Sequence, residues 1–192
     1  MEILGKKKIV LTVKKIMEYY HPEIWNQASS IIEKLARFQE KVVEMLPTCK
    51  KNLPKSFEEL KEQKAQSYLS DYLRLRLLYA FARELWMLID KQCRELAENN
   101  YGEDSQTVLY NTLNKVSSYP FDDIANDSVT GLLRFDKMFI NGLVVIAFKN
   151  WEFHDIIGSI NRCGLQNEQL WRDAVDDTIP TCSNIGELLA DE

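Results

Sequence analysis

The residues of this chain that could support acid–base chemistry at neutral pH are its two histidines, His21 and His154. His21 precedes a proline at a predicted helix junction, so we expect it to lie on the surface. Asp155 follows His154, but adjacent residues of a helix do not face each other and cannot form an orienting pair directly. Neither histidine is therefore predicted to be catalytic.

Adjacent carboxylates are the second group that could do chemistry, as metal ligands or as an acid–base pair. Both kinds of site need carboxylates that converge in a cleft, whereas the positions here indicate helix ends and solvated surface. The chain also lacks a glycine-rich phosphate loop and a G-x-S-x-G motif. We therefore predict no catalytic, cofactor-binding or metal-binding residues and no enzymatic activity, with an enzyme built on an atypical site as the alternative. The pairs are Glu58-Glu59, Asp122-Asp123 and Asp176-Asp177.

The four cysteines, Cys49, Cys93, Cys163 and Cys182, leave two interpretations open. No two of them form a C-x-x-C pair, which argues against a zinc site. Cys93 lies in a helical apolar pattern, where a thiol packs as a small apolar side chain. The first residues do not read as a secretory leader, so we expect a reducing compartment and a cytoplasmic location. The alternative is a secreted helical cytokine with two disulfides.

The net charge of −5 is distributed unevenly along the 192 residues. Residues 1–70 contain 13 Lys+Arg and 9 Asp+Glu, whereas residues 71–192 contain 11 and 20. The acidic second half would repel phosphate and the lysine runs are short, so we predict no nucleic-acid partner. The longest apolar run, residues 142–148, falls far short of the roughly 20 residues that a membrane span needs.

The elements that must position any site are predicted to be helices. Glycine (7) and proline (5) are scarce, and apolar residues recur at steps of three and four. A first apolar face runs from Ile9 through Met17 to Tyr20, although its start could also be a short strand. The next helix begins near Ile24 and is predicted to end at Pro47, before a polar linker over residues 47–55.

The following stretch is the longest predicted helical region. Ser56 and Glu59 have the spacing of a capping box, in which both side chains cap free backbone N–H groups. No glycine or proline follows until after Tyr101, and the stretch is apolar on two faces. It therefore has to be covered on two sides, and it forms either one helix or two.

The second half is predicted to hold the centre of the fold. A short helix near residues 105–116 should turn Val108, Leu109, Leu113 and Val116 inward. Residues 136–151 are apolar on nearly every side, so they should form a central, surrounded helix. The prediction is an all-α, compact helical bundle with an N-terminal helical segment. Its parts are 1–55 (N-terminal segment and linker), 56–180 (bundle) and 181–192 (acidic tail).

An aromatic stripe runs along the long helical stretch, through Tyr72, Tyr79 and Trp86. Its simplest interpretation is core packing. The alternative is a stripe that faces a partner, because Tyr and Trp anchor interfaces well. We take these three residues as candidate partner-binding residues, together with Trp151 at the end of the apolar segment and Phe153 just after it.

Four segments of the sequence occur in the same order as similar segments in one known protein family. They are residues 69–76 (Leu-Ser-Asp-Tyr-Leu-Arg-Leu-Arg), 88–102 (ending Ala-Glu-Asn-Asn-Tyr-Gly), 121–124 (Phe-Asp-Asp-Ile) and 136–151 (an acidic cap, an apolar core and a terminal tryptophan). Together they resemble the poxviral Bcl-like proteins, the immune-evasion branch of the Bcl-two fold, over about residues 66–155. Two features depart from that family: the first 60 residues look like an addition, and the tail after Gly164 is poor in apolar residues.

The resemblance implies a protein made in an infected host cell. Such proteins occupy host signalling adaptors or kinases that lead to NF-kappa-B or interferon induction, and some hold death-promoting peptides in a groove. Here Glu152 and Phe153 stand where the cellular family has the glycine and arginine that serve such a peptide, so a charge-assisted hydrogen bond is lost. We therefore expect an intracellular protein–protein interaction module that interferes with signalling, with a homodimer also considered. The alternative is a structural or assembly subunit whose helices 24–46 and 56–100 form an extended hairpin with sister chains.

Overall fold

The computed structural model describes residues 12–98, 103–118 and 165–182. These residues form five α-helices and one short 3-10 helix, η2, and the described ranges contain no strand. The helices are α1 (Val13–Tyr20), α2 (Pro22–Lys51), α3 (Gln63–Glu98), α4 (Glu103–Ser117) and α9 (Glu168–Asp176), and η2 spans Phe57–Lys61. The predicted all-α class is confirmed.

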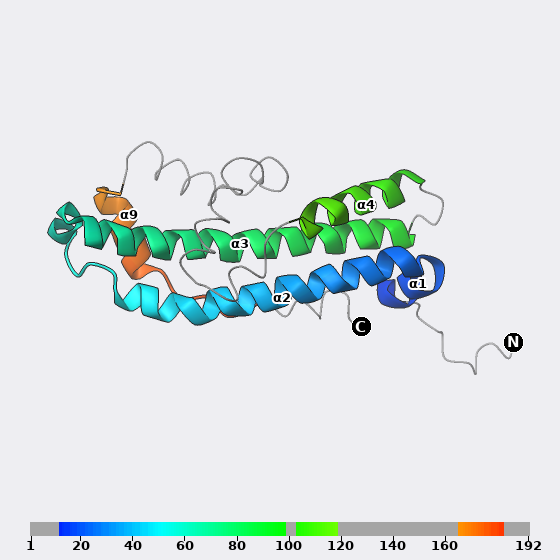
Figure 1. Ribbon diagram of the computed structural model, residues 1–192, viewed down its shortest axis with the longest axis horizontal. Coiled ribbons are helices and arrows are strands. Elements are labelled where there is room, and N and C mark those ends of the chain that lie inside the picture. Colours follow the sequence, from blue (N-terminus) through cyan, green and yellow to red (C-terminus); the bar gives the residue numbers. More distant parts are fainter. Residues whose placement is uncertain (1–11, 99–102, 119–164, 183–192) are drawn as a thin grey trace, which may run out of the picture.

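The frame of the described structure is a long antiparallel pair of helices, α2 and α3 (Figure 1). They contain 30 and 36 residues, which at a rise of about 1.5 Å per residue gives lengths of about 45 and 54 Å. α3 is continuous, so the long stretch forms one α-helix, preceded by η2 rather than joined to a second α-helix. The remaining helices pack against the two ends of this pair.

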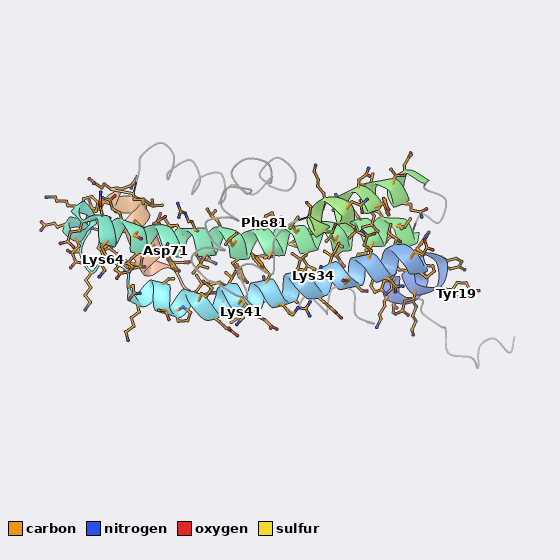
Figure 2. All side chains as sticks on the ribbon, viewed as in Figure 1. Tyr19, Lys34, Lys41, Lys64, Asp71 and Phe81 are labelled. Atoms are coloured by element: carbon orange, nitrogen blue, oxygen red, sulfur yellow. The ribbon has the colours of Figure 1, made fainter. Side chains whose placement is uncertain are left out.

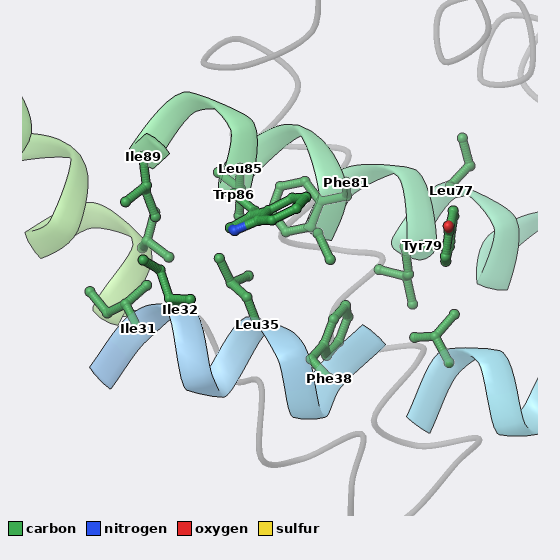
Figure 3. Close-up of a cluster of buried hydrophobic side chains, with 14 of the residues drawn as sticks. Ile31, Ile32, Leu35, Phe38, Leu77, Tyr79, Phe81, Leu85, Trp86 and Ile89 are labelled. Atoms are coloured by element: carbon green, nitrogen blue, oxygen red, sulfur yellow. The ribbon is translucent and has the colours of Figure 1, made fainter. Parts of the chain in front are cut away.

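The core of the described residues lies between α2 and α3 (Figure 3). Ile31 and Leu35 of α2 point toward Leu85, Trp86 and Ile89 of α3. One cluster of buried side chains includes residues of α1, α2, α3, α4 and α9. Helices on both sides of the predicted domain boundary at residues 55 and 56 therefore share one core. Residues 136–151, which were predicted to form the central helix, lie outside the described residues.

Pro47 does not end α2, so the predicted end of this helix is wrong. The helix continues to Lys51 with Pro47 exposed inside it, although proline cannot donate the backbone hydrogen bond of that position. Tertiary packing explains the continuation, because Leu46 is buried and Cys49 packs against the core. Lys50 and Lys51 also place positive charge at the negative end of the helix dipole.

The predicted capping box is only half formed. The Ser56 side chain makes no capping hydrogen bond, and the element that it begins is η2 rather than an α-helix. Glu59 Oε2 does reach back, but it accepts a hydrogen bond of 3.1 Å from the backbone N–H of Lys55, one residue before the predicted target. The tight 3-10 turn changes which N–H group lies within reach of the carboxylate.

The predicted inward faces of the two helices α1 and α4 are right except at one position each. Met17 of α1 is buried, but Tyr20 is 53% exposed because the helix ends beside it. Leu109, Leu113 and Val116 of α4 are buried, whereas Val108 is 49% exposed. Consecutive helical residues point about 100° apart, so Val108 cannot share the direction of Leu109.

Candidate interaction site

The three aromatic residues predicted from the stripe on α3, Tyr72, Tyr79 and Trp86, are buried. Trp86 packs among the aliphatic side chains between α2 and α3 (Figure 3). The two tyrosine hydroxyl groups instead bond to residues close to the end of the described chain. In this arrangement the three side chains pack in the core, and their role as partner-binding residues stays a prediction. Trp151 and Phe153 lie outside the described residues.

The buried end of Tyr72 is held in a polar cluster with Arg76 and Asp177. The Tyr72 hydroxyl donates a short hydrogen bond to Asp177 Oδ2. Arg76, one turn later on α3, donates from Nε to the same oxygen at 2.6 Å and from a terminal nitrogen to Oδ1 at 3.4 Å. Burial, together with the ionised carboxylate of Asp177, raises the pKa of Tyr72 well above its usual value. Tyr72 therefore stays a neutral hydrogen-bond donor at physiological pH.

Further contacts hold the segment around Asp177 against α3 and against the residues between α2 and η2. We call residues 165–182, which include α9 and the extended chain after it, the C-terminal strap. The Tyr79 hydroxyl donates to the carbonyl of Thr181 at 2.7 Å, and the Arg76 guanidinium lies over the Tyr79 ring at 5.6 Å. At the other end of the strap, Trp171 Nε1 donates to the carbonyl of Pro54 at 2.8 Å. The strap is therefore anchored at both ends by specific polar contacts.

Asp177 and Arg76 are the site residues that sequence reasoning missed. Asp177 was interpreted only as one of a pair of solvated carboxylates, and Arg76 only as part of a family-like pattern. They are 101 positions apart in the chain, so no local spacing connects them. The one available signal was the position of Arg76 between two tyrosines of a buried stripe, because arginine is not fully buried without a partner.

A second candidate surface lies at the opposite end of the hairpin. Tyr19 and Tyr20, the last residues of α1, are 79% and 53% exposed and touch edge to face with ring centroids 4.8 Å apart. Figure 2 shows Tyr19 pointing away from the bundle at this end. The pair is fixed in place by α1, whose buried Met17 packs into the core and whose Thr12 side chain accepts a hydrogen bond from Lys15 N–H.

His21 lies just behind this pair, and its predicted surface position is only partly right. The residue is half-buried, its Nε2 is a buried atom, and no described residue hydrogen-bonds that atom.

Asp90 on α3 is a buried carboxylate that pairs with Arg94 at 3.0 Å. Burial raises the pKa of Asp90, although Arg94 acts in the opposite direction. Within the described ranges, no group of three or more His, Cys, Asp or Glu side chains is placed to hold a metal ion.

Removing the Tyr72 hydroxyl should measure how strongly α3 holds the strap. We expect Tyr72→Phe to lower the free energy of unfolding by about 1–3 kcal/mol, because a hydrogen bond to a charged group is lost from a buried position. Urea unfolding followed by circular dichroism measures the change. Tyr68→Phe, one turn earlier on the same helix, is the matched control and should change stability by less than about 0.5 kcal/mol. Equal losses in both variants would contradict the assigned role of Tyr72.

The described cysteines should differ in reactivity. Cys49, Cys93 and Cys182 are free thiols, so the two disulfides of the cytokine alternative, which need all four cysteines, are not formed. Burial raises the pKa of Cys93 to about 12, and only about one thiol in 100,000 is then ionised at neutral pH. Cys182 is exposed, and we expect iodoacetamide to modify it at least about 10-fold faster than Cys93. Peptide mapping by mass spectrometry checks this order, and comparable rates in the folded chain would refute it.

Comparison of the chain with models of protein families, with curated proteins and with solved structures found no match. The resemblance to the poxviral Bcl-like proteins therefore stays a prediction, and much of the segment that carries it lies outside the described residues. Among the described helices, none combines the length and the apolar character that crossing a membrane requires.

Proposed function

We propose that this chain is a non-enzymatic protein–protein interaction module of the cytoplasm, and that Tyr19 and Tyr20 anchor a protein partner. The observation that carries the proposal is the exposure of this edge-to-face pair at the end of the α2–α3 hairpin. A tyrosine offers a large apolar ring and a hydroxyl group at the cost of few rotatable bonds, which is why tyrosines are enriched among interface hot spots.

The position of the pair supports this role. α1 packs against both α2 and α3, so the two rings are presented on a framework that is already ordered. A preorganised anchor loses little conformational entropy when it binds, and more of the contact energy then appears as affinity. Exposed apolar side chains that occur singly, such as Met87 on α3, need no such explanation.

The test compares proteins captured by matched variants. The immobilised chain, the Tyr19→Ser/Tyr20→Ser double variant and a Tyr110→Ser control are exposed to mammalian cell extract, and bound proteins are quantified by mass spectrometry. Tyr110 is an exposed tyrosine of α4, so its loss controls for the general removal of an aromatic ring. We expect a discrete set of proteins to fall at least about 10-fold with the double variant only, since hot-spot residues each contribute about 2 kcal/mol or more. Identical sets for all three chains would refute the proposal.

A finer form of the proposal concerns the identity of the partner. It holds that the partners are host signalling adaptors or kinases upstream of NF-kappa-B or interferon induction, and it rests on the family resemblance. Expression of the chain in stimulated mammalian cells carrying an NF-kappa-B or interferon-promoter reporter tests it. We expect the wild-type chain to reduce the reporter signal and the Tyr19→Ser/Tyr20→Ser variant to reduce it less. An unchanged signal from both reporters would reject this finer form and leave the interaction module itself open.

A second candidate function is that of an assembly subunit, in which sister chains associate through their hairpins. It is favoured by the long α2–α3 pair, which matches the extended hairpin expected for such a subunit. Sedimentation velocity over a 100-fold range of concentration distinguishes the two. A concentration-dependent oligomer supports the assembly subunit, whereas a monomer throughout the range counts against it.

A further inference from the structure

We propose that the face of α3 around Tyr72, Arg76 and Tyr79 is a binding site for an extended acidic segment of a protein partner. In this structure the chain's own C-terminal strap fills that site as an internal stand-in for the partner. The inference rests on the proposed interaction function and adds a second site, at the end of the hairpin away from Tyr19 and Tyr20, with a defined ligand chemistry.

The side chains that α3 contributes to the site are suited to binding a carboxylate. Arg76 offers two nitrogens to the two oxygens of Asp177, and the Tyr72 hydroxyl completes the shell with a third donor. The Arg76 side chain is about three-quarters buried, so its charge needs an anionic partner when the site is closed. Planar, two-point recognition of a carboxylate is a specific use of arginine.

The strap shows which other features a ligand would need. After Asp177 the backbone is extended, with φ −63° and ψ 137° at Asp177 itself. Ile179, two residues later, packs against the core, and the carbonyl of Thr181 accepts the Tyr79 hydrogen bond. The ligand is therefore an extended peptide with an acidic residue, an apolar residue two positions on, and a free backbone carbonyl four positions on. Pro180, next to that carbonyl, fixes its own φ angle and favours an extended conformation at Ile179 before it.

The strap competes with a partner as a tethered ligand. A segment linked to its own site has an effective concentration in the millimolar range, so an outside peptide is excluded unless it binds more tightly or the strap is weakened. Besides Asp177, the strap is held by hydrogen bonds from Tyr79 and Trp171. Apolar strap residues, among them Leu170 and Ala174, also pack in the core. Asp177 accepts all three hydrogen bonds that Tyr72 and Arg76 donate to the strap, so its removal leaves this carboxylate position empty and the side chains of α3 unchanged.

The experiment uses the full chain and a labelled synthetic peptide of residues 174–182 carrying Cys182→Ser. Binding is measured by fluorescence anisotropy for the wild type, for Asp177→Ala and for Asp177→Ala combined with Arg76→Leu. We expect Asp177→Ala to bind the peptide at least about 10-fold more tightly than the wild type. The combined variant should lose that gain, and a peptide in which Asp177 is also alanine should not bind to any of the three chains.

A second release variant guards against a folding defect. Ile179→Ser weakens the strap through its apolar anchor and leaves Asp177 in place, and circular dichroism reports whether each variant is folded. The proposal would be overturned if both release variants were folded and neither bound the peptide more tightly than the wild type. It would also be overturned if Asp177→Ala combined with Arg76→Leu bound the peptide as tightly as Asp177→Ala alone. Because no partner is used, these failures would leave the test at Tyr19 and Tyr20 unaffected.

Discussion

Phe81→Ala is expected to lower the free energy of unfolding by about 3–5 kcal/mol, which is the usual cost of removing a buried phenylalanine ring. Phe81 is fully buried near the middle of α3, where Figure 3 shows it beside Leu85 and Trp86, above the side chains of α2. Phe81 lies between two long helices, α2 and α3, so we expect the cavity to close only in part. Urea unfolding monitored by circular dichroism measures the loss.

Met87→Ala is the matched control for this variant. Met87 is a large apolar residue on the same helix, but it is 44% exposed. Its truncation leaves no closed cavity, so we expect a change of less than about 1 kcal/mol. Since small domains have a total stability of only about 5–15 kcal/mol, Phe81→Ala should also leave a measurable unfolded population at elevated temperature. Similar losses in the two variants would contradict the position of the core between α2 and α3.

Pro47→Ala is expected to raise the free energy of unfolding by about 2 kcal/mol. A proline in a helix interior costs about 3 kcal/mol relative to alanine, because it removes a backbone hydrogen bond and crowds the preceding turn. Proline also restricts the unfolded chain, and losing that restriction offsets about 0.4–1 kcal/mol of the gain. Pro47 is exposed, so alanine replaces it without opening a cavity. Urea unfolding again gives the difference.

Pro22→Ala provides the comparison for Pro47. Pro22 is the first residue of α2, where the missing N–H group has no helical acceptor and the fixed φ angle favours the helix. The same substitution there should leave stability unchanged or reduce it by up to about 1 kcal/mol. If both variants changed stability in the same direction and by the same amount, α2 could not continue through Pro47.

The all-α class and most of the buried stripes were predictable from local spacing. The two faces of α3 and the inward residues Leu109, Leu113 and Val116 follow from a period of 3.6, which depends only on neighbouring positions. The break at His21 and Pro22 also depends on backbone chemistry that is local. The errors at Val108 and Tyr20 concern the edges of such stripes, where one step along the helix turns a side chain by about 100°.

The continuation of α2 through Pro47 and the choice between the two interpretations of the aromatic stripe needed the folded chain. At Pro47 the local preference is opposed by the packing of Leu46 and Cys49, which no window of sequence contains. Tyr72 and Asp177 are 105 positions apart, and only the path of the chain makes them partners. Periodicity indicates that a side chain points inward. Contacts between segments that are distant in the sequence determine which residues it packs against.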